Sequence, residues 1–85
     1  MTEASERSHI IVIDDEAAPR ESLRILLSSK YDVDLADCVD EGVSQLKQRP
    51  ADLVILDLRM PGKDGLDGLA EIRAIDPNVS VVILT

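Results

Sequence analysis

The chain has 85 residues, enough for one small domain, and 45% of them are hydrophobic, so a buried core is possible. Its 17 acidic residues outnumber the 9 basic ones, and the formal net charge of −8 disfavours direct binding to nucleic acid or anionic lipid. The single cysteine, Cys38, excludes an internal disulfide and has no neighbour at zinc-ligand spacing. No apolar run approaches the ~20 residues that cross a membrane, and no signal peptide is recognisable, so we expect a cytoplasmic protein.

The first half of the chain predicts two strands around a helix. Residues 1–8 (MTEASERS) are polar and are predicted to form a flexible tail. The apolar run 9–14 (HIIVID) is typical of a strand that is buried on both faces. Pro19 fits only the first turn of a helix, which therefore begins near residue 16 and continues to about residue 29. Leu23, Leu26 and Leu27 predict its buried stripe. Residues 32–36 (DVDLA) alternate polar and apolar, which indicates an edge strand.

The second half repeats the alternation of helix and strand. Val39, Val43 and Leu46 have helical spacing and predict a helix that ends before Pro50. Residues 52–57 (DLVILD) predict a second fully buried strand. Apolar residues at 66, 69 and 72 predict a third helix that stops near residues 76–77. Residues 79–84 (VSVVIL) predict a fourth strand, and Thr85 is the last residue.

This order of elements predicts an α/β fold with a doubly wound parallel sheet over residues 9–85. A flavodoxin-like strand order 2-1-3-4 puts the alternating second strand at an edge and the first and third strands in the centre. Right-handed crossovers place the first helix on one face and the other two helices on the opposite face. The fourth strand is then also an edge, although its apolar sequence is typical of a covered strand.

Acidic residues gather at the ends of the two central strands. Asp14 and Asp15 end the first strand and Asp57 ends the third, at the edge where such sheets bind their ligands, and Glu16 follows them. Clustered carboxylates repel one another unless a cation neutralises them, and oxygen ligands of this kind suit Mg²⁺. With the metal bound, one carboxylate could attack phosphorus and form an aspartyl phosphate.

Each of these residues also has a simpler interpretation. An aspartate at a strand end most often forms a loop or caps a helix, and Pro61-Gly62 alone is only a turn signal. Arg59 and Lys63 could attract phosphate or belong to a solvated loop. His9 is interpreted as structural, and Cys38 as a small buried or half-buried residue. The coincidence of three aspartates at one edge of the same predicted sheet favours the functional interpretation.

Three segments together, IIVIDDE, DLVILDLRMPGKDGL and VVILT, resemble the receiver domain of bacterial two-component response regulators, which has a CheY-like fold. The resemblance implies that Asp57 accepts a phosphoryl group from a histidine kinase. It implies that Asp14, Asp15, Asp57 and the backbone carbonyl of Arg59 hold Mg²⁺, and that Thr85 is the switch hydroxyl. Residues 19–27 and 68–85 are also similar to receivers of transcription activators of the nitrogen-regulatory type.

The sequence departs from this family at its end. The resemblance implies a fifth strand ending in a lysine and two further helices, which the 85 residues do not contain. We therefore expect a receiver domain truncated after the fourth strand, without its output domain, that self-associates through the open strand edge or the bare sheet face.

Three alternatives remain at this point. The first is a receiver-like interaction or dimerisation module that is inactive in phosphotransfer. The second is a Mg²⁺-dependent phosphohydrolase, which is disfavoured because DDEAA replaces the D-x-D-x-T of dehalogenase-like enzymes. The third is a flavin or nucleotide binder, which is disfavoured because the loop DDEAAPR is acidic and lacks glycine. No turnover of an external substrate is expected.

Overall fold

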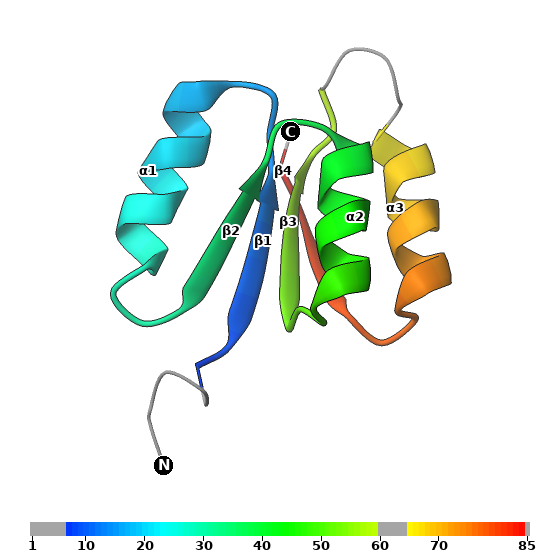
Figure 1. The fold of residues 1–85 in the computed structure, drawn as a ribbon. Helices are drawn as coiled ribbons and strands as arrows, with labels where there is room; N and C mark the ends of the chain where they lie inside the picture. Colours follow the sequence, from blue (N-terminus) through cyan, green and yellow to red (C-terminus); the bar gives the residue numbers. More distant parts are fainter. Residues whose placement is uncertain (1–6, 60–64, 85) are drawn as a thin grey trace.

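A computed structural model describes residues 7–59 and 65–84, which form a parallel sheet with helices on both faces (Figure 1). The elements are β1 (His9–Ile13), α1 (Ala17–Leu27), β2 (Asp32–Ala36), α2 (Val39–Gln48), β3 (Leu53–Asp57), α3 (Gly65–Ile75) and β4 (Ser80–Leu84). The predicted alternation of strand and helix is confirmed. Pro19 lies in the first turn of α1, where its missing N–H removes no helical hydrogen bond.

The strand order is β2-β1-β3-β4, which confirms the predicted topology. All three pairings are parallel, and the register places Ile13 beside Ala36 and Leu56, and Asp57 beside Leu84. β1 is buried along its whole length, whereas β2 and β4, at the edges of the sheet formed by the described residues, are partly exposed. The continuous apolar sequences of β1 and β3 therefore match strands that are covered on both faces.

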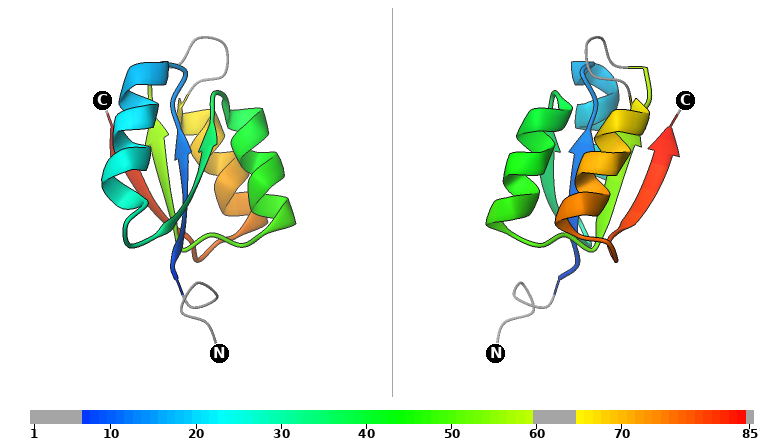
Figure 2. Two further views of the ribbon diagram at one scale, coloured as in Figure 1. Left: turned by 60° about the vertical axis from the view of Figure 1, so that its left-hand side comes forward. Right: turned by 90° about the vertical axis from the view of Figure 1, so that its right-hand side faces the viewer.

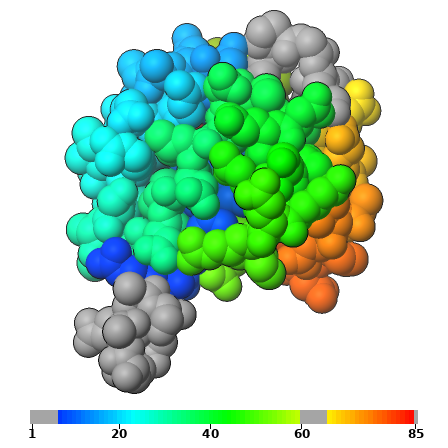
Figure 3. All heavy atoms as spheres, viewed as in Figure 1, coloured from blue at the N-terminus to red at the C-terminus, as the bar shows by residue number. Residues whose placement is uncertain are grey.

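The two faces of the sheet are covered unequally. α2 and α3 lie side by side on one face, and α1 lies on the other, as the crossover rule predicts (Figure 2). The larger core cluster lies under α2 and α3; it consists of Ile11, Ile13, Ala36, Val39, Val43, Leu46, Ala51, Val54, Leu56, Ile72 and Val79. The smaller cluster lies under α1 and consists of Ile10, Val12 and Ile55, with Leu23 and Leu27 packed on it. α2 dominates the surface seen in Figure 3, with α1 and α3 on either side.

Two predictions about side-chain burial are wrong. Leu26 is 73% exposed, so the buried stripe of α1 is reduced to the half-buried Leu23 and Leu27. Since α1 is the only described helix on its face, residues on its flanks have no neighbouring helix to pack against. Cys38 is exposed, because it is the N-cap residue of α2 and stands outside the helix face that packs on the sheet.

The segment before β1 contacts the body of the domain. Arg7, which belongs to the predicted tail, donates hydrogen bonds to the carbonyl oxygens of Ser28 (3.3 Å) and Ser29 (3.0 Å) at the end of α1. The carbonyl oxygen of Ser8 accepts from the amide of Asp32 at 2.9 Å. Among the described residues, no helix is both long enough and apolar enough to span a bilayer.

Candidate functional site

Two of the three predicted aspartates are buried at the carboxyl end of the sheet. Asp14 directly follows β1 and Asp57 is the last residue of β3, and their exposed fractions are only 4% and 6%. Asp15, one residue farther along the loop, is exposed. Each of the three residues offers a carboxylate oxygen, and these oxygens all lie within 4.8 Å of one another. The prediction that the three carboxylates are neighbours is therefore confirmed.

Backbone amides orient both buried carboxylates in the same way. The amide of Glu16 donates to Oδ1 of Asp14 at 2.9 Å, and the amide of Arg59 donates to Oδ1 of Asp57 at 2.9 Å. In each case the carboxylate caps the turn that follows its own strand. One oxygen of each carboxylate, Oδ1, is thus held by a backbone amide. Asp14 and Asp57 can therefore cap a turn and also take part in a functional site.

The backbone of Asp14 is fixed by two further hydrogen bonds. Its amide donates to the carbonyl oxygen of Ala36 at 3.0 Å, and its own carbonyl oxygen accepts from the Arg20 guanidinium at 2.7 Å. Sequence reasoning did not assign a role to Arg20. The signal that could have found it is its position in the first turns of α1, where a long cationic side chain can reach back to the acidic loop.

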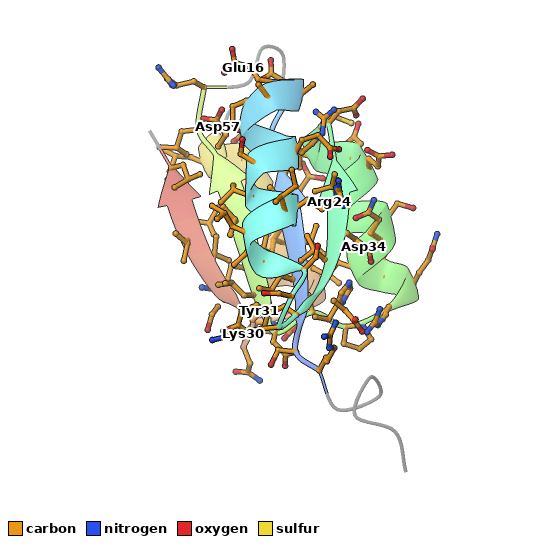
Figure 4. The ribbon with its side chains drawn as sticks, turned by 90° about the vertical axis from the view of Figure 1, so that its left-hand side faces the viewer. Glu16, Arg24, Lys30, Tyr31, Asp34 and Asp57 are labelled. Atoms are coloured by element: carbon orange, nitrogen blue, oxygen red, sulfur yellow. The ribbon has the colours of Figure 1, made fainter. Side chains whose placement is uncertain are left out.

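An open cavity of about 250 Å³ lies next to these carboxylates and is lined by Asp15, Glu16, Asp57 and Arg59. A neighbouring hollow of about 270 Å³ extends from Asp57 towards Pro19 and Leu84. Glu16 therefore looks into the same crevice as Asp57, and both side chains lie towards the same end of the molecule in Figure 4. The buried Asp57 carboxylate can be reached by a ligand from outside.

The oxygen atoms at this site suit a small divalent cation. In octahedral coordination at about 2.1 Å, ligand oxygens lie about 3 to 4.2 Å apart, close to the spacing of the three carboxylates. Two of the carboxylates are buried, and a backbone amide orients each of these two. This donor set, oxygen only and acidic, fits Mg²⁺ better than a softer transition metal.

Several predicted residues lie outside the described part of the chain. These are Thr85, the turn Met60-Pro61-Gly62 and Lys63. Arg59 is described: its amide binds Asp57 and the residue lines the cavity. The switch role of Thr85 and the metal role of the Arg59 carbonyl stay predictions.

Comparison with known proteins adds independent information. The family model for the response regulator receiver domain matches residues 10–85. The transcriptional regulatory protein GlrR of Escherichia coli (strain K12) is 38% identical over 79 residues, which are 92% of this chain and 18% of GlrR. The chain thus spans about a fifth of the length of that relative.

Solved structures give the same result for the fold. The receiver domain protein from Methanospirillum hungatei JF-1 superposes with a TM-score of 0.86 at 22% identity, over 91% of this chain and 62% of that chain. A chain in the crystal structure of the histidine kinase ThkA in complex with the response regulator protein TrrA matches with a TM-score of 0.81 at 37% identity. That match covers 92% of this chain and 68% of the other.

Proposed function

Because the chain belongs to the response regulator receiver domain family of two-component systems, we propose that Asp57 is its phosphoryl acceptor. The proposal rests on the orientation and the surroundings of the Asp57 carboxylate. The carboxylate is 6% exposed, its Oδ1 is held by the Arg59 amide, and it borders an open cavity beside two other carboxylates. A nucleophile needs this combination of a fixed orientation and an accessible approach.

In the proposed reaction, Oδ2 of Asp57 attacks the phosphorus atom of a phosphohistidine. The O–P bond forms as the N–P bond breaks, the electron pair of that bond returns to the histidine nitrogen, and the product is an acyl phosphate. The hydrogen bond from the Arg59 amide to Oδ1 fixes the plane of the carboxylate during the attack. The acyl phosphate hydrolyses without turnover of an external substrate, so the chain acts as a signalling module rather than as an enzyme.

Mg²⁺ is the proposed cofactor. It would be held by Asp14, Asp15, Asp57 and the carbonyl of Arg59, and it would neutralise charge on the transferring phosphoryl group. The protein contributes the orientation of these ligands. Asp14 is held in place by hydrogen bonds to the Glu16 amide, the Ala36 carbonyl and the Arg20 guanidinium, and these bonds do not require a bound metal.

Incubation with Mg²⁺ and acetyl phosphate, followed by intact mass spectrometry, tests the proposal. The wild-type chain is expected to gain the mass of one phosphoryl group, and Asp57→Asn is expected to gain none. Asp52→Asn is the matched control, because it removes one carboxylate at the opposite end of β3 and keeps an oxygen that can accept from the His9 amide. Absence of an adduct on the wild-type chain would support the inactive interaction module instead. Sustained hydrolysis of phosphate esters would support a phosphohydrolase.

The partner that follows from this proposal is a sensor histidine kinase in the cytoplasm. The complex of ThkA with TrrA supports a kinase partner, and the name of GlrR supports transcription control by an output domain. A chain with a net charge of −8 would leave DNA binding to such an output domain.

The edge formed by β4 supports a proposed self-association. β4 pairs only with β3 among the described strands, and its side chains Val82 and Leu84 are 44% and 38% exposed on the face that α1 leaves uncovered. An apolar, unpaired strand edge is a template for pairing with a second chain.

Light scattering across micromolar concentrations tests this second proposal. We expect the mean mass to rise with concentration and the rise to be lost in Val82→Lys, which places a charge on the exposed face of β4. A wild-type chain that stays monomeric over this range would contradict self-association and would leave the phosphoryl-acceptor proposal unaffected.

A further inference from the structure

The hollow beside Asp57 has an apolar wall to which the proposed attack on phosphorus gives no role. Its volume is about 270 Å³, and the described residues that line it are Asp14, Glu16, Pro19, Asp57, Arg59 and Leu84. Among the described residues, only charged ones line the neighbouring cavity of about 250 Å³, namely Asp15, Glu16, Asp57 and Arg59. Because the two cavities share Asp57, a molecule that reacts with this carboxylate can meet a charged region and a partly apolar one together.

Pro19 and Leu84 lie on the same face of the sheet as the Asp57 side chain. Side chains alternate along a strand, and Ile55 of β3 belongs to the cluster under α1, so the side chain of Asp57 also lies on the α1 face. Leu84 is the register neighbour of Asp57, and its carbonyl oxygen accepts from the Leu58 amide at 3.1 Å. Pro19 is in the first turn of α1. Two apolar side chains from different elements therefore flank the nucleophile.

Phosphoryl transfer determines where the leaving group of the donor lies. The attacking oxygen, the phosphorus and the leaving atom are roughly in line, so the leaving group lies beyond the phosphorus as seen from Asp57. The anionic phosphoryl oxygens match the charged cavity, whereas the leaving group can occupy the hollow with the apolar wall. That hollow is slightly smaller than the roughly 300–1,000 Å³ of sites for drug-sized ligands, so it suits a small leaving group.

The charges around the two cavities disfavour a leaving group that departs as an anion. Their four carboxylates carry a formal charge of −4; a bound Mg²⁺ and the Arg59 guanidinium would supply +3, so −4 + 3 = −1 remains. An acetate ion that leaves into this site is repelled. A neutral imidazole is not repelled, and its apolar ring body suits contact with Pro19 and Leu84.

We propose, on the basis of the proposed role of Asp57 as phosphoryl acceptor, that Pro19 and Leu84 form the subsite for the leaving group and select a donor that releases an imidazole ring. The Asp57 carboxylate forms the O–P bond as the P–N bond breaks, and the electron pair of the P–N bond stays on the ring nitrogen. A donor ring that carries a proton on its other nitrogen leaves as neutral imidazole. Pro19 and Leu84 bind the ring and transfer no proton.

Two small donors with the same kind of bond test the subsite. Phosphoramidate and phosphoimidazole both transfer a phosphoryl group from nitrogen, but the first releases ammonia and the second releases the ring. The rate constant of adduct formation on the full chain is measured by intact mass spectrometry with each donor and Mg²⁺. The quantity compared is the ratio of the phosphoimidazole rate constant to the phosphoramidate rate constant. A variant that only perturbs the site lowers both rate constants and leaves this ratio unchanged.

Replacement of either apolar side chain should lower the ratio. A methylene in a closed pocket changes selectivity by roughly 10–200-fold, and this hollow is open, so we expect a decrease of about three- to tenfold in Pro19→Ala and in Leu84→Ala. Leu84→Met keeps a long apolar side chain and should have a ratio close to that of wild type. Val82→Ala is the matched control, because Val82 is also an exposed apolar residue of β4 but is not among the residues that line the hollow.

Failure of this subsite and failure of the proposed function give different results. A wild-type chain that forms no adduct with either donor would contradict the acceptor role of Asp57. Adducts from both donors, with one ratio shared by wild type, Pro19→Ala and Leu84→Ala, would leave that role intact and overturn the leaving-group subsite. A decrease in Val82→Ala as large as that in Leu84→Ala would also overturn the subsite.

Discussion

Close packing beneath the acidic site makes Gly42 a sensitive position. Gly42 is buried in α2 where this helix crosses β1, and an added Cβ would lie 2.4 Å from Cδ1 and 2.7 Å from Cγ1 of Ile13. Ordinary contact begins at 3.4 Å, so the overlaps are 1.0 and 0.7 Å. Ile13 is 1% exposed, and it is the residue immediately before Asp14. Gly42→Ala therefore presses on the strand end that carries the site.

Two opposing effects set the size of the change. Overpacking of a core costs about 1–3 kcal/mol, and alanine is favoured over glycine inside a helix by about 1 kcal/mol. Because two atoms of one rigidly packed side chain overlap, we expect the upper part of the first range. The free energy of unfolding should then fall by about 1–2 kcal/mol in Gly42→Ala.

Urea denaturation followed by circular dichroism measures this loss. Gly68→Ala is a graded control, since its added Cβ would lie 2.8 Å from Cγ2 of Val39, an overlap of only 0.6 Å, and its loss should be smaller. Adding Ile13→Val to Gly42→Ala removes Cδ1 and should restore part of the stability. The reasoning is refuted if Gly42→Ala is as stable as wild type, or if Ile13→Val worsens it by as much as it worsens the wild-type chain.

Three further predictions follow from the same structure. Leu56→Ala should lower the free energy of unfolding by about 2–5 kcal/mol, whereas Leu26→Ala on the exposed flank of α1 should change it by less than about 0.5 kcal/mol in the same urea assay. Arg20→Gln should weaken Mg²⁺ binding in calorimetry, with Arg20→Lys closer to wild type, because Arg20 anchors the carbonyl of Asp14; equal affinities would contradict this role. Chelation of Mg²⁺ by EDTA during the incubation with acetyl phosphate should prevent formation of the phosphoryl adduct. An adduct that still forms would exclude a metal requirement.

The fold could be predicted from sequence because local patterns and topology agree. The apolar runs of β1 and β3 are long enough to be buried on both faces, and the alternation in β2 marks an edge. Burial on α1 was predicted less well. The spacing of Leu23, Leu26 and Leu27 identifies the apolar stripe of α1. How much of this stripe is buried depends on the elements that lie beside the helix. Leu26 is exposed because α1 has no neighbour on its face among the described helices.

The acidic residues of the site could be predicted from the sequence, but some of the contacts around them could not. Asp14, Asp15 and Asp57 could be placed together because parallel strands end at one edge of the sheet. The contact between Arg20 and the Asp14 carbonyl could not, since it depends on the rotamer of a long side chain and on the exact entry angle of α1. The environment of His9 was equally inaccessible: its two ring contacts come from residues 25 and 41 positions away in the chain.

The identity of the phosphorylated residue is the most direct test of the proposed function. After incubation with Mg²⁺ and acetyl phosphate, borohydride reduces an aspartyl phosphate to homoserine, and tandem mass spectrometry of the peptides locates the change. The proposed function predicts homoserine in place of Asp57 and unchanged Asp14 and Asp15. Homoserine at another aspartate, or unmodified aspartate throughout a chain that remains folded, would contradict it.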